Sequence, residues 1–188
     1  MFLVFSSTAL AQPGPPLRRE MARAGFLVGQ WEGEGWVQFS PDGDRLTGRA
    51  SGEGEAVLSG LALSWKSRVG TGDRELSENA VSLRFRRDSA VFRVTTHAPG
   101  LTLDGWARVA ECELSWGLQV PEGQAGAGQL IRYTLRVDAE NRLTEVGERS
   151  EDEGLTWVQF SGAEMAGKSG AGCRVSEAQP ARTGGEER

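Results

Sequence analysis

The sequence predicts an all-β protein: an antiparallel up-and-down β-barrel of about ten strands, preceded by a short N-terminal helix. Three observations predict it. Apolar and polar residues alternate with a period of two over most of the chain. Turn-forming residues recur at intervals of about 8–12 residues. The chain also has 26 glycines among its 188 residues, which suits turns and tightly coiled strands. Because the expected connections are short, neighbouring strands should pair, and closure of the sheet removes exposed edges.

The N-terminus reads as an export signal. An apolar run and small residues precede Ala9-Leu10-Ala11, which fits the pattern that signal peptidases cleave, although a basic start is missing. A disordered apolar N-terminus is the alternative. Export would place the mature chain in the periplasm or outside the cell, and no other apolar run approaches the ~20 residues that span a bilayer. The predicted domains are a signal peptide (1–11), a linker and short helix (12–25), the barrel (26–165) and a disordered tail (166–188).

The helix is expected over Leu17–Leu27, with Met21 and Phe26 near one face. The first strand, Trp31–Ser40, has two clearly different faces. Its apolar face carries Trp31, Gly33, Gly35, Val37 and Phe39, and its wetter face carries Glu32, Glu34, Trp36, Gln38 and Ser40. Glycines inside a strand indicate sharp coiling or the close approach of another backbone. The remaining strands are expected at Arg45–Leu58, Leu61–Val69, Glu78–Arg87, Ala90–Thr96, Leu101–Ala110, Glu113–Val120, Gln129–Val137, Leu143–Ser150 and Thr156–Met165.

The sequence leaves open whether its two cysteines, Cys112 and Cys173, form a disulfide. In an oxidising compartment an even number of cysteines permits one bridge, which would fasten the tail to the barrel. Two independent thiols are the alternative, since the sequence does not show whether the Cα atoms come close enough.

Ser150–Trp157 matches the S-x-D-x-G-x-T-W pattern of the Asp-box. In this motif the Asp side chain accepts backbone N–H groups across a turn and the Gly supplies a positive φ. The motif occurs once and no repeat of about 40–50 residues is present, which excludes a propeller. It marks a hairpin and gives no indication of glycosidase activity.

Both ends of the chain carry a resemblance to a family. Gly29, Trp31, Gly33, Gly35 and Trp36 at the start, and Gly147 to Ser150, Asp152, Gly154, Thr156, Trp157, Phe160 and Glu164-Met165 at the end, resemble a bacterial lipocalin-like (calycin) family of unknown function. Ile131 to Thr134 fits the same family. The resemblance covers roughly Phe26 to Met165 and implies a β-barrel around an apolar cavity. Phe160–Met165 departs from the family's phenylalanine-rich ending, which predicts an irregular last strand.

In lipocalin-like barrels a Trp of the opening Gly-x-Trp often stacks under an Arg from a late strand. The resemblance therefore implies a structural closure between Trp31 and Arg149, worth ~1–2 kcal/mol if desolvated. The opening strand is also distantly similar to the haem-binding nitrobindins, whose barrels need an axial histidine from the late part of the chain. The one histidine here, His97, falls in an expected loop, which argues against haem.

The net charge and the missing catalytic motifs argue against several classes of function. A net charge of −5 without basic clusters argues against nucleic acid. The chain lacks G-x-S-x-G, H-E-x-x-H and C-x-x-C, so we expect no catalysis, and we expect the acid pairs to be solvated and to bind no metal. An aromatic set either fills the core or lines a ligand cavity. Its members, the cavity candidates, are Trp65, Phe85, Phe92, Trp116 and Tyr133.

The sequence therefore predicts a monomeric or homodimeric barrel that binds a small hydrophobic molecule, such as a lipid, without catalysis and without a cofactor. The alternative is a structural or interaction module whose barrel is filled by its own side chains. A haem-binding barrel and an enzyme that uses the barrel mouth rank below both.

Overall fold

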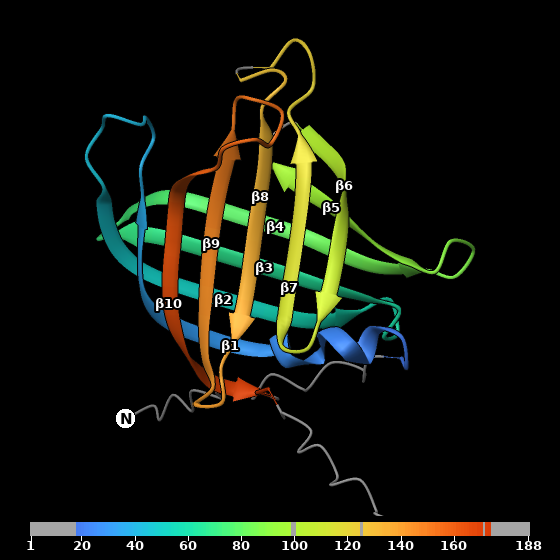
Figure 1. Cartoon of the computed structure of the whole chain (residues 1–188). Helices are drawn as coiled ribbons and strands as arrows, with labels where there is room; N and C mark the ends of the chain where they lie inside the picture. The colour runs from blue at the N-terminus through green and yellow to red at the C-terminus, as the bar shows by residue number, and fades with distance from the viewer. Residues whose placement is uncertain (1–17, 99–100, 125, 171, 174–188) are drawn as a thin grey trace, which may run out of the picture.

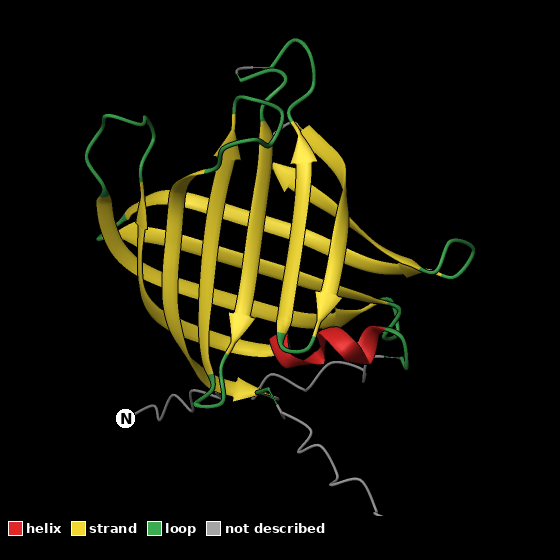
Figure 2. Ribbon diagram, viewed as in Figure 1, coloured by secondary structure: helices red, strands yellow, loops and turns green. Residues whose placement is uncertain are grey.

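Ten antiparallel strands close into a barrel, and one short 3-10 helix lies across one end of it (Figures 1 and 2). The computed structural model of the chain describes residues 18–98, 101–124, 126–170 and 172–173. Each strand pairs with its neighbours in the sequence, and β10 returns to pair with β1, which confirms the predicted fold class. The elements are η1 (Met21–Leu27), β1 (Gly29–Val37), β2 (Leu46–Val57), β3 (Ala62–Thr71), β4 (Arg74–Arg86), β5 (Val91–Ala98), β6 (Leu101–Ala110), β7 (Glu113–Gln119), β8 (Leu130–Val137), β9 (Arg142–Ser150) and β10 (Val158–Gly170).

The two ends of the barrel differ. At one, which we call the helix end, η1 buries Met21 and Leu27 in the barrel core. The Arg23 guanidinium Nη2 donates to the carbonyl of Val109 on β6 at 2.6 Å, which ties η1 to the wall. At the other, the loop end, the β1–β2, β7–β8 and β9–β10 connections surround the mouth (Figure 2). The helix is shorter than expected, beginning at Met21 and not at Leu17.

β1 has the two faces that the sequence predicts. Trp31 and Val37 are buried while Glu32 and Glu34 are exposed. Both glycines of the inner face lie where other groups come close, because a Cβ on Gly33 would collide with the Glu164 carbonyl and one on Gly35 would lie 2.8 Å from Val69. The prediction failed at the next inner position. Phe39 is 63% exposed because β1 ends before it.

Apolar side chains fill the barrel toward the helix end. The inner faces of the strands bring large residues together there with less than 2% of their surface exposed, so this part of the lumen is an ordinary packed core. The largest of these residues are Trp31, Trp65, Trp116, Leu27, Leu63, Leu83, Leu114, Leu135, Leu143, Val81 and Val94.

The last strand is longer than the sequence predicts. β10 runs past Met165 to Gly170, and Ala166 and Gly167 pair with β1 where a disordered tail was expected. The physical reason is that strands pair through their backbone N–H and C=O groups. A segment with few apolar side chains can therefore still pair with the free edge of β1. The predicted irregularity is present as a register shift between Gln159 and Ser161. Residues 1–17, with the predicted signal peptide, and 174–188 of the predicted tail lie outside the described residues.

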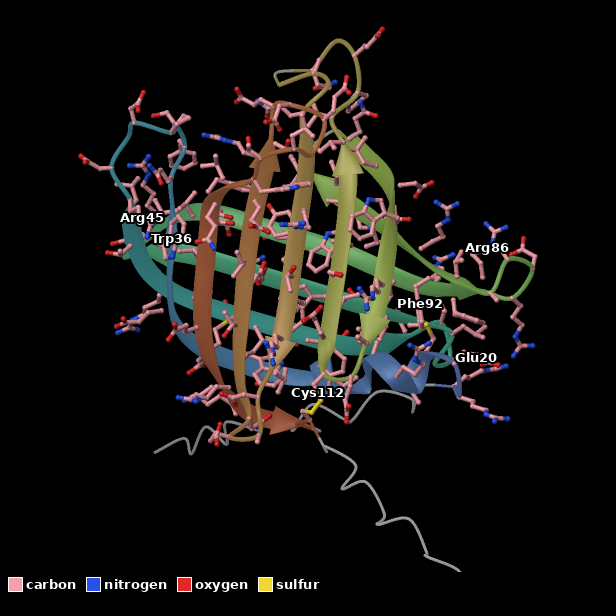
Figure 3. The ribbon with its side chains drawn as sticks, viewed as in Figure 1. Glu20, Trp36, Arg45, Arg86, Phe92 and Cys112 are labelled. Atoms are coloured by element: carbon pink, nitrogen blue, oxygen red, sulfur yellow. A yellow bond between two sulfur atoms is a disulfide. The ribbon has the colours of Figure 1, made fainter. Side chains whose placement is uncertain are left out.

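Cys112 and Cys173 form a disulfide, with their Cα atoms 5.5 Å apart. The bridge joins the β6–β7 turn to the residues that follow β10, at the helix end of the barrel (Figure 3). The two cysteines are therefore bridged and are not the independent thiols that the sequence left as an alternative. Within the described residues, no helix combines the length and apolar character that a membrane crossing requires.

Candidate functional site

The five aromatic cavity candidates do not line one common wall. Trp65 and Trp116 are 1% and 0% exposed and belong to the packed core. Phe85 and Phe92 pack edge to face near the helix end, with ring centroids 5.1 Å apart and the Arg23 guanidinium 5.4 Å above the Phe92 ring. Only Tyr133 of the five is half-buried in the loop half of the lumen.

An aromatic stack marks this loop half. The Tyr133 ring lies 5.2 Å from Trp116 in a stacked arrangement and meets Phe160 edge-on at 5.8 Å. Gly147 lies opposite Tyr133 on β9 and makes room for it, because a Cβ there would lie 2.9 Å from the tyrosine ring. Ile131 and Phe160 are half-buried above this level, in contrast to the fully buried core below. The inner surface is thus filled at the helix end and partly exposed at the loop end.

A buried polar bridge crosses the lumen between these two halves. Glu145 on β9 accepts hydrogen bonds at Oε1 from Ser67 of β3 at 2.9 Å and from Asn79 of β4 at 3.2 Å. Glu145, Ser67 and Asn79 are each only 7% exposed. Among the described residues, the other carboxyl oxygen, Glu145 Oε2, has no hydrogen-bond partner. A buried polar atom without a partner is costly, so this atom needs an explanation.

Burial raises the pKa of Glu145. The hydrogen bonds from Asn79 and Ser67 act in the opposite direction without overcoming it. The indole N–H of Trp65 also favours the charged form of Glu145, although it falls short of hydrogen-bond geometry. The pKa of Tyr133 is raised as well, first by burial and then by the charge of Glu145. Burial in the lumen therefore disfavours the charged form of Glu145 unless a further donor or cation reaches it.

Glutamine at position 145 should change how stability depends on pH. Because the folded-state pKa of Glu145 lies above its ordinary value of 4.5, the folded wild type holds a proton that the unfolded chain releases. Its free energy of unfolding should therefore decline as pH rises above 4.5. In Glu145→Gln this decline should be smaller, so the variant gains stability relative to wild type at pH 8 compared with pH 4. Urea denaturation at both pH values measures this. Glu164→Gln, on the exposed face of β10, is the matched control; an equal response from both variants would contradict the prediction.

A small cavity of about 20 Å³ lies beside Glu145. That volume is close to the space one water molecule occupies. The polar residues around it come from five strands and include Ser77, Tyr133 and Ser161. Arg68 also borders the cavity, but its guanidinium is held by Glu78 at 2.7 Å and is half exposed.

A second hollow is far larger, about 1620 Å³, and open to solvent. It follows the glycine-rich wall of β1, β2, β3 and β10, where Gly33, Gly35 and Gly48 carry no side chains. Its lining includes Glu145 and also outward-facing residues such as Arg49, so it reaches both faces of this wall. Its lining mixes charged residues with apolar ones such as Ala50 and Val69, so it differs from the apolar cavity that the resemblance implies.

The predicted closure between Trp31 and Arg149 is wrong. Arg149 lies at the loop end, where its Nη1 donates to the Phe39 carbonyl at 3.4 Å. Trp31 lies toward the helix end and its indole N–H donates to the Leu27 carbonyl at 3.3 Å. The two residues are on different levels of the barrel because most of β1 (Gly29–Val37) lies between Trp31 and Phe39. Trp31 closes the helix end through η1.

The Asp-box turn forms part of the rim at the loop end. Asp152 accepts hydrogen bonds from the Thr156 hydroxyl at 2.6 Å, from the Thr156 backbone N–H at 2.8 Å and from the Ser150 hydroxyl at 2.7 Å, which hold its pKa at about 2. Gly154 has a φ of 91°, as the motif requires. Trp157 donates to the Gly154 carbonyl at 3.0 Å and lies 4.1 Å under the Arg132 guanidinium. The predicted hairpin geometry is confirmed.

Aromatic-cation stacking also holds the β1–β2 loop, where the Arg45 guanidinium lies 3.9 Å from the Trp36 ring (Figure 3). Trp36 in turn covers Gly162 on β10. The tryptophan on the wetter face of β1 is therefore part of the outer wall near the mouth.

His97 lies on the outside of the barrel. The sequence predicts a loop at this residue, but His97 belongs to β5, because β5 continues to Ala98. It is exposed and its Nε2 lies 3.2 Å from the Ser82 hydroxyl. Its ring does not face the lumen, so it is not placed to be an axial ligand there. Among the described residues, no group of three or more His, Cys, Asp or Glu side chains is arranged to hold a metal ion.

Comparison with known proteins gives the fold alone. No protein-family model and no curated protein matches the chain. Among solved structures, the chain is similar to the crystal structure of Rv2717c from M. tuberculosis, with a TM-score of 0.59 and 14% sequence identity. The match covers 81% of this chain and 99% of that one. The likeness supports the closed β-barrel fold.

Sequence reasoning missed the polar bridge. Glu145 alternates with Leu143 and Gly147 on β9, so its parity places it on the same face as a fully buried leucine. That parity was a usable signal for a charged residue inside the barrel. Its partners, Ser67 and Asn79, come from the opposite wall, and no local pattern reveals such a contact.

Proposed function

We propose that this protein binds a small, largely apolar molecule in the loop half of the barrel without catalysis. The observation that carries the proposal is the contrast along the lumen. Core residues such as Trp65 and Leu135 are fully buried, whereas Ile131, Tyr133 and Phe160 on the inner surface near the mouth keep part of their area exposed. Inner apolar surface that the chain itself does not cover is available to a ligand.

The disulfide supports a proposed export of the protein to the periplasm or the exterior, since such bridges persist in oxidising compartments. The proposed ligand is a single lipid-like molecule of modest size, because the helix half of the lumen has no room for a longer one.

Native mass spectrometry and thermal denaturation with a panel of lipid-like molecules test this. We expect a co-purifying mass or a rise in Tm, and we expect Ile131→Asp to abolish either, because a carboxylate at the mouth disfavours an apolar occupant. Val91→Asp, at an exposed valine on the outside of β5, is the matched control and should bind normally. An apo mass with no shift in Tm for any compound would favour the alternative of an interaction module with a filled barrel.

A further inference from the structure

We propose that the ligand carries a primary ammonium group, which enters the small cavity in the barrel and donates hydrogen bonds to Glu145 Oε2. The inference rests on the proposed function and names the chemical class of its ligand: an amphipathic primary amine, with its apolar part toward the mouth. Three observations carry it.

The first is an acceptor oxygen, on a buried carboxyl group, that receives no hydrogen bond from the described residues. Ser67 and Asn79 both donate to Oε1 and fix the orientation of the carboxyl group. Oε2 of this 7% exposed residue has no partner among the described residues, and Glu145 lines the cavity. Two donors that position one oxygen while the other stays free form a prepared acceptor for a third donor.

The second is the size and polarity of the space. At about 20 Å³ the cavity matches a group the size of water, which an ammonium head is and a trimethylammonium head is not. Beyond Glu145, the residues that line it include Ser77, Tyr133 and Ser161, whose hydroxyl groups are acceptors for the remaining N–H groups.

The third is the charge around the space. The groups that face Glu145 are all uncharged and come from several strands: Tyr133 from β8, Trp65 and Ser67 from β3, Asn79 from β4, and Ser161 and Ala163 from β10. The Trp65 indole N–H favours the charged form of Glu145 but falls short of hydrogen-bond geometry. The cationic side chains nearby are held elsewhere: Arg68 pairs with Glu78, and Arg149 reaches the Phe39 carbonyl at the mouth. No described cation in the lining competes with a ligand cation for Oε2.

The aromatic stack completes the site. Tyr133 borders the cavity and also packs between Trp116 and Phe160, so its ring lies between the polar cavity and the half-exposed apolar surface. A ligand with its ammonium beside Glu145 would place an alkyl or aryl body along Tyr133 and Phe160. Cation–π attraction between the ammonium and the tyrosine ring adds to the ion pair.

Calorimetric titration with four octyl compounds tests the inference: octylamine, octanol, octanoate and octyltrimethylammonium. In the wild type at pH 7 we expect octylamine to bind at least about tenfold more tightly than octanol, and octanoate and octyltrimethylammonium to bind weakly. In Glu145→Gln, which keeps the size and the acceptor oxygen, the preference for the amine should disappear while octanol binds as before.

Each outcome decides. Equal affinity for octylamine and octanol in the wild type, or a preference that persists in Glu145→Gln, overturns the amine assignment and leaves the proposed apolar binding intact. Equal binding of octyltrimethylammonium and octylamine also overturns it, because the former has no N–H to donate. Failure of all four compounds, together with an apo mass, overturns the proposed function as well. If Glu145→Gln does not fold, the wild type alone decides through the comparison of the two ammonium compounds.

Discussion

Replacing Trp31 with alanine is expected to lower the free energy of unfolding by about 3–5 kcal/mol. Trp31 is 2% exposed, and a Cβ built on Gly52 of β2 would lie 3.4 Å from the Trp31 Cβ, so Gly52 itself offers no side chain to fill the space. The variant also loses the hydrogen bond from the indole N–H to the Leu27 carbonyl, which joins β1 to the last residue of η1. The loss in free energy of unfolding therefore combines a large cavity, lost apolar burial and the lost hydrogen bond between β1 and η1.

Urea denaturation followed by near-ultraviolet circular dichroism measures this effect. Trp106→Ala is the matched control, since Trp106 is 50% exposed on the outer face of β6, where it covers Gly117. The control should lose about 1 kcal/mol or less. Similar losses in the two variants would show that Trp31 does not close the helix end.

How far the sequence determines the fold is clear from β1. Alternation places Trp31 and Val37 inside and Glu32 outside because a strand has a period of exactly two residues, and this rule is local. Strand ends are less local. Phe39 continues the alternation, yet it is exposed because pairing with β2 and β10 stops at Val37. Likewise β10 continues to Gly170 because β1 offers it a partner, and not because its own sequence is apolar.

The candidate site was harder to predict for the same reason. Tyr133 was identified from its aromatic character, but Trp65 and Phe92 share that character and lie in the core and near the helix end. What distinguishes them is their level along the barrel axis, which depends on strand tilt and register. The contact of Glu145 with Ser67 and Asn79 crosses the lumen between β9 and the β3–β4 pair, so it follows only from the closed barrel.

Removing the disulfide is expected to lower the free energy of unfolding by about 2–4 kcal/mol. Cys112 and Cys173 are 61 residues apart in sequence, and a link of that span restricts the unfolded chain strongly. In the folded protein the bridge joins elements that already lie together, since β10 pairs with β1 and β9 along its length. Most of the effect should therefore come from the unfolded state.

Urea denaturation with and without dithiothreitol separates the bridge from other effects. The midpoint of the wild type should fall in the reductant, and that of the Cys112→Ser, Cys173→Ser double variant should start low and stay unchanged. An unchanged wild-type midpoint, or a thiol titration that finds two free cysteines before reduction, would contradict the bridge.

Because the bridge lies at the helix end and the polar cavity lies toward the loop half, the double variant should still distinguish octylamine from octanol. A loss of that preference would mean that the two ends of the barrel are coupled through the packed core between them.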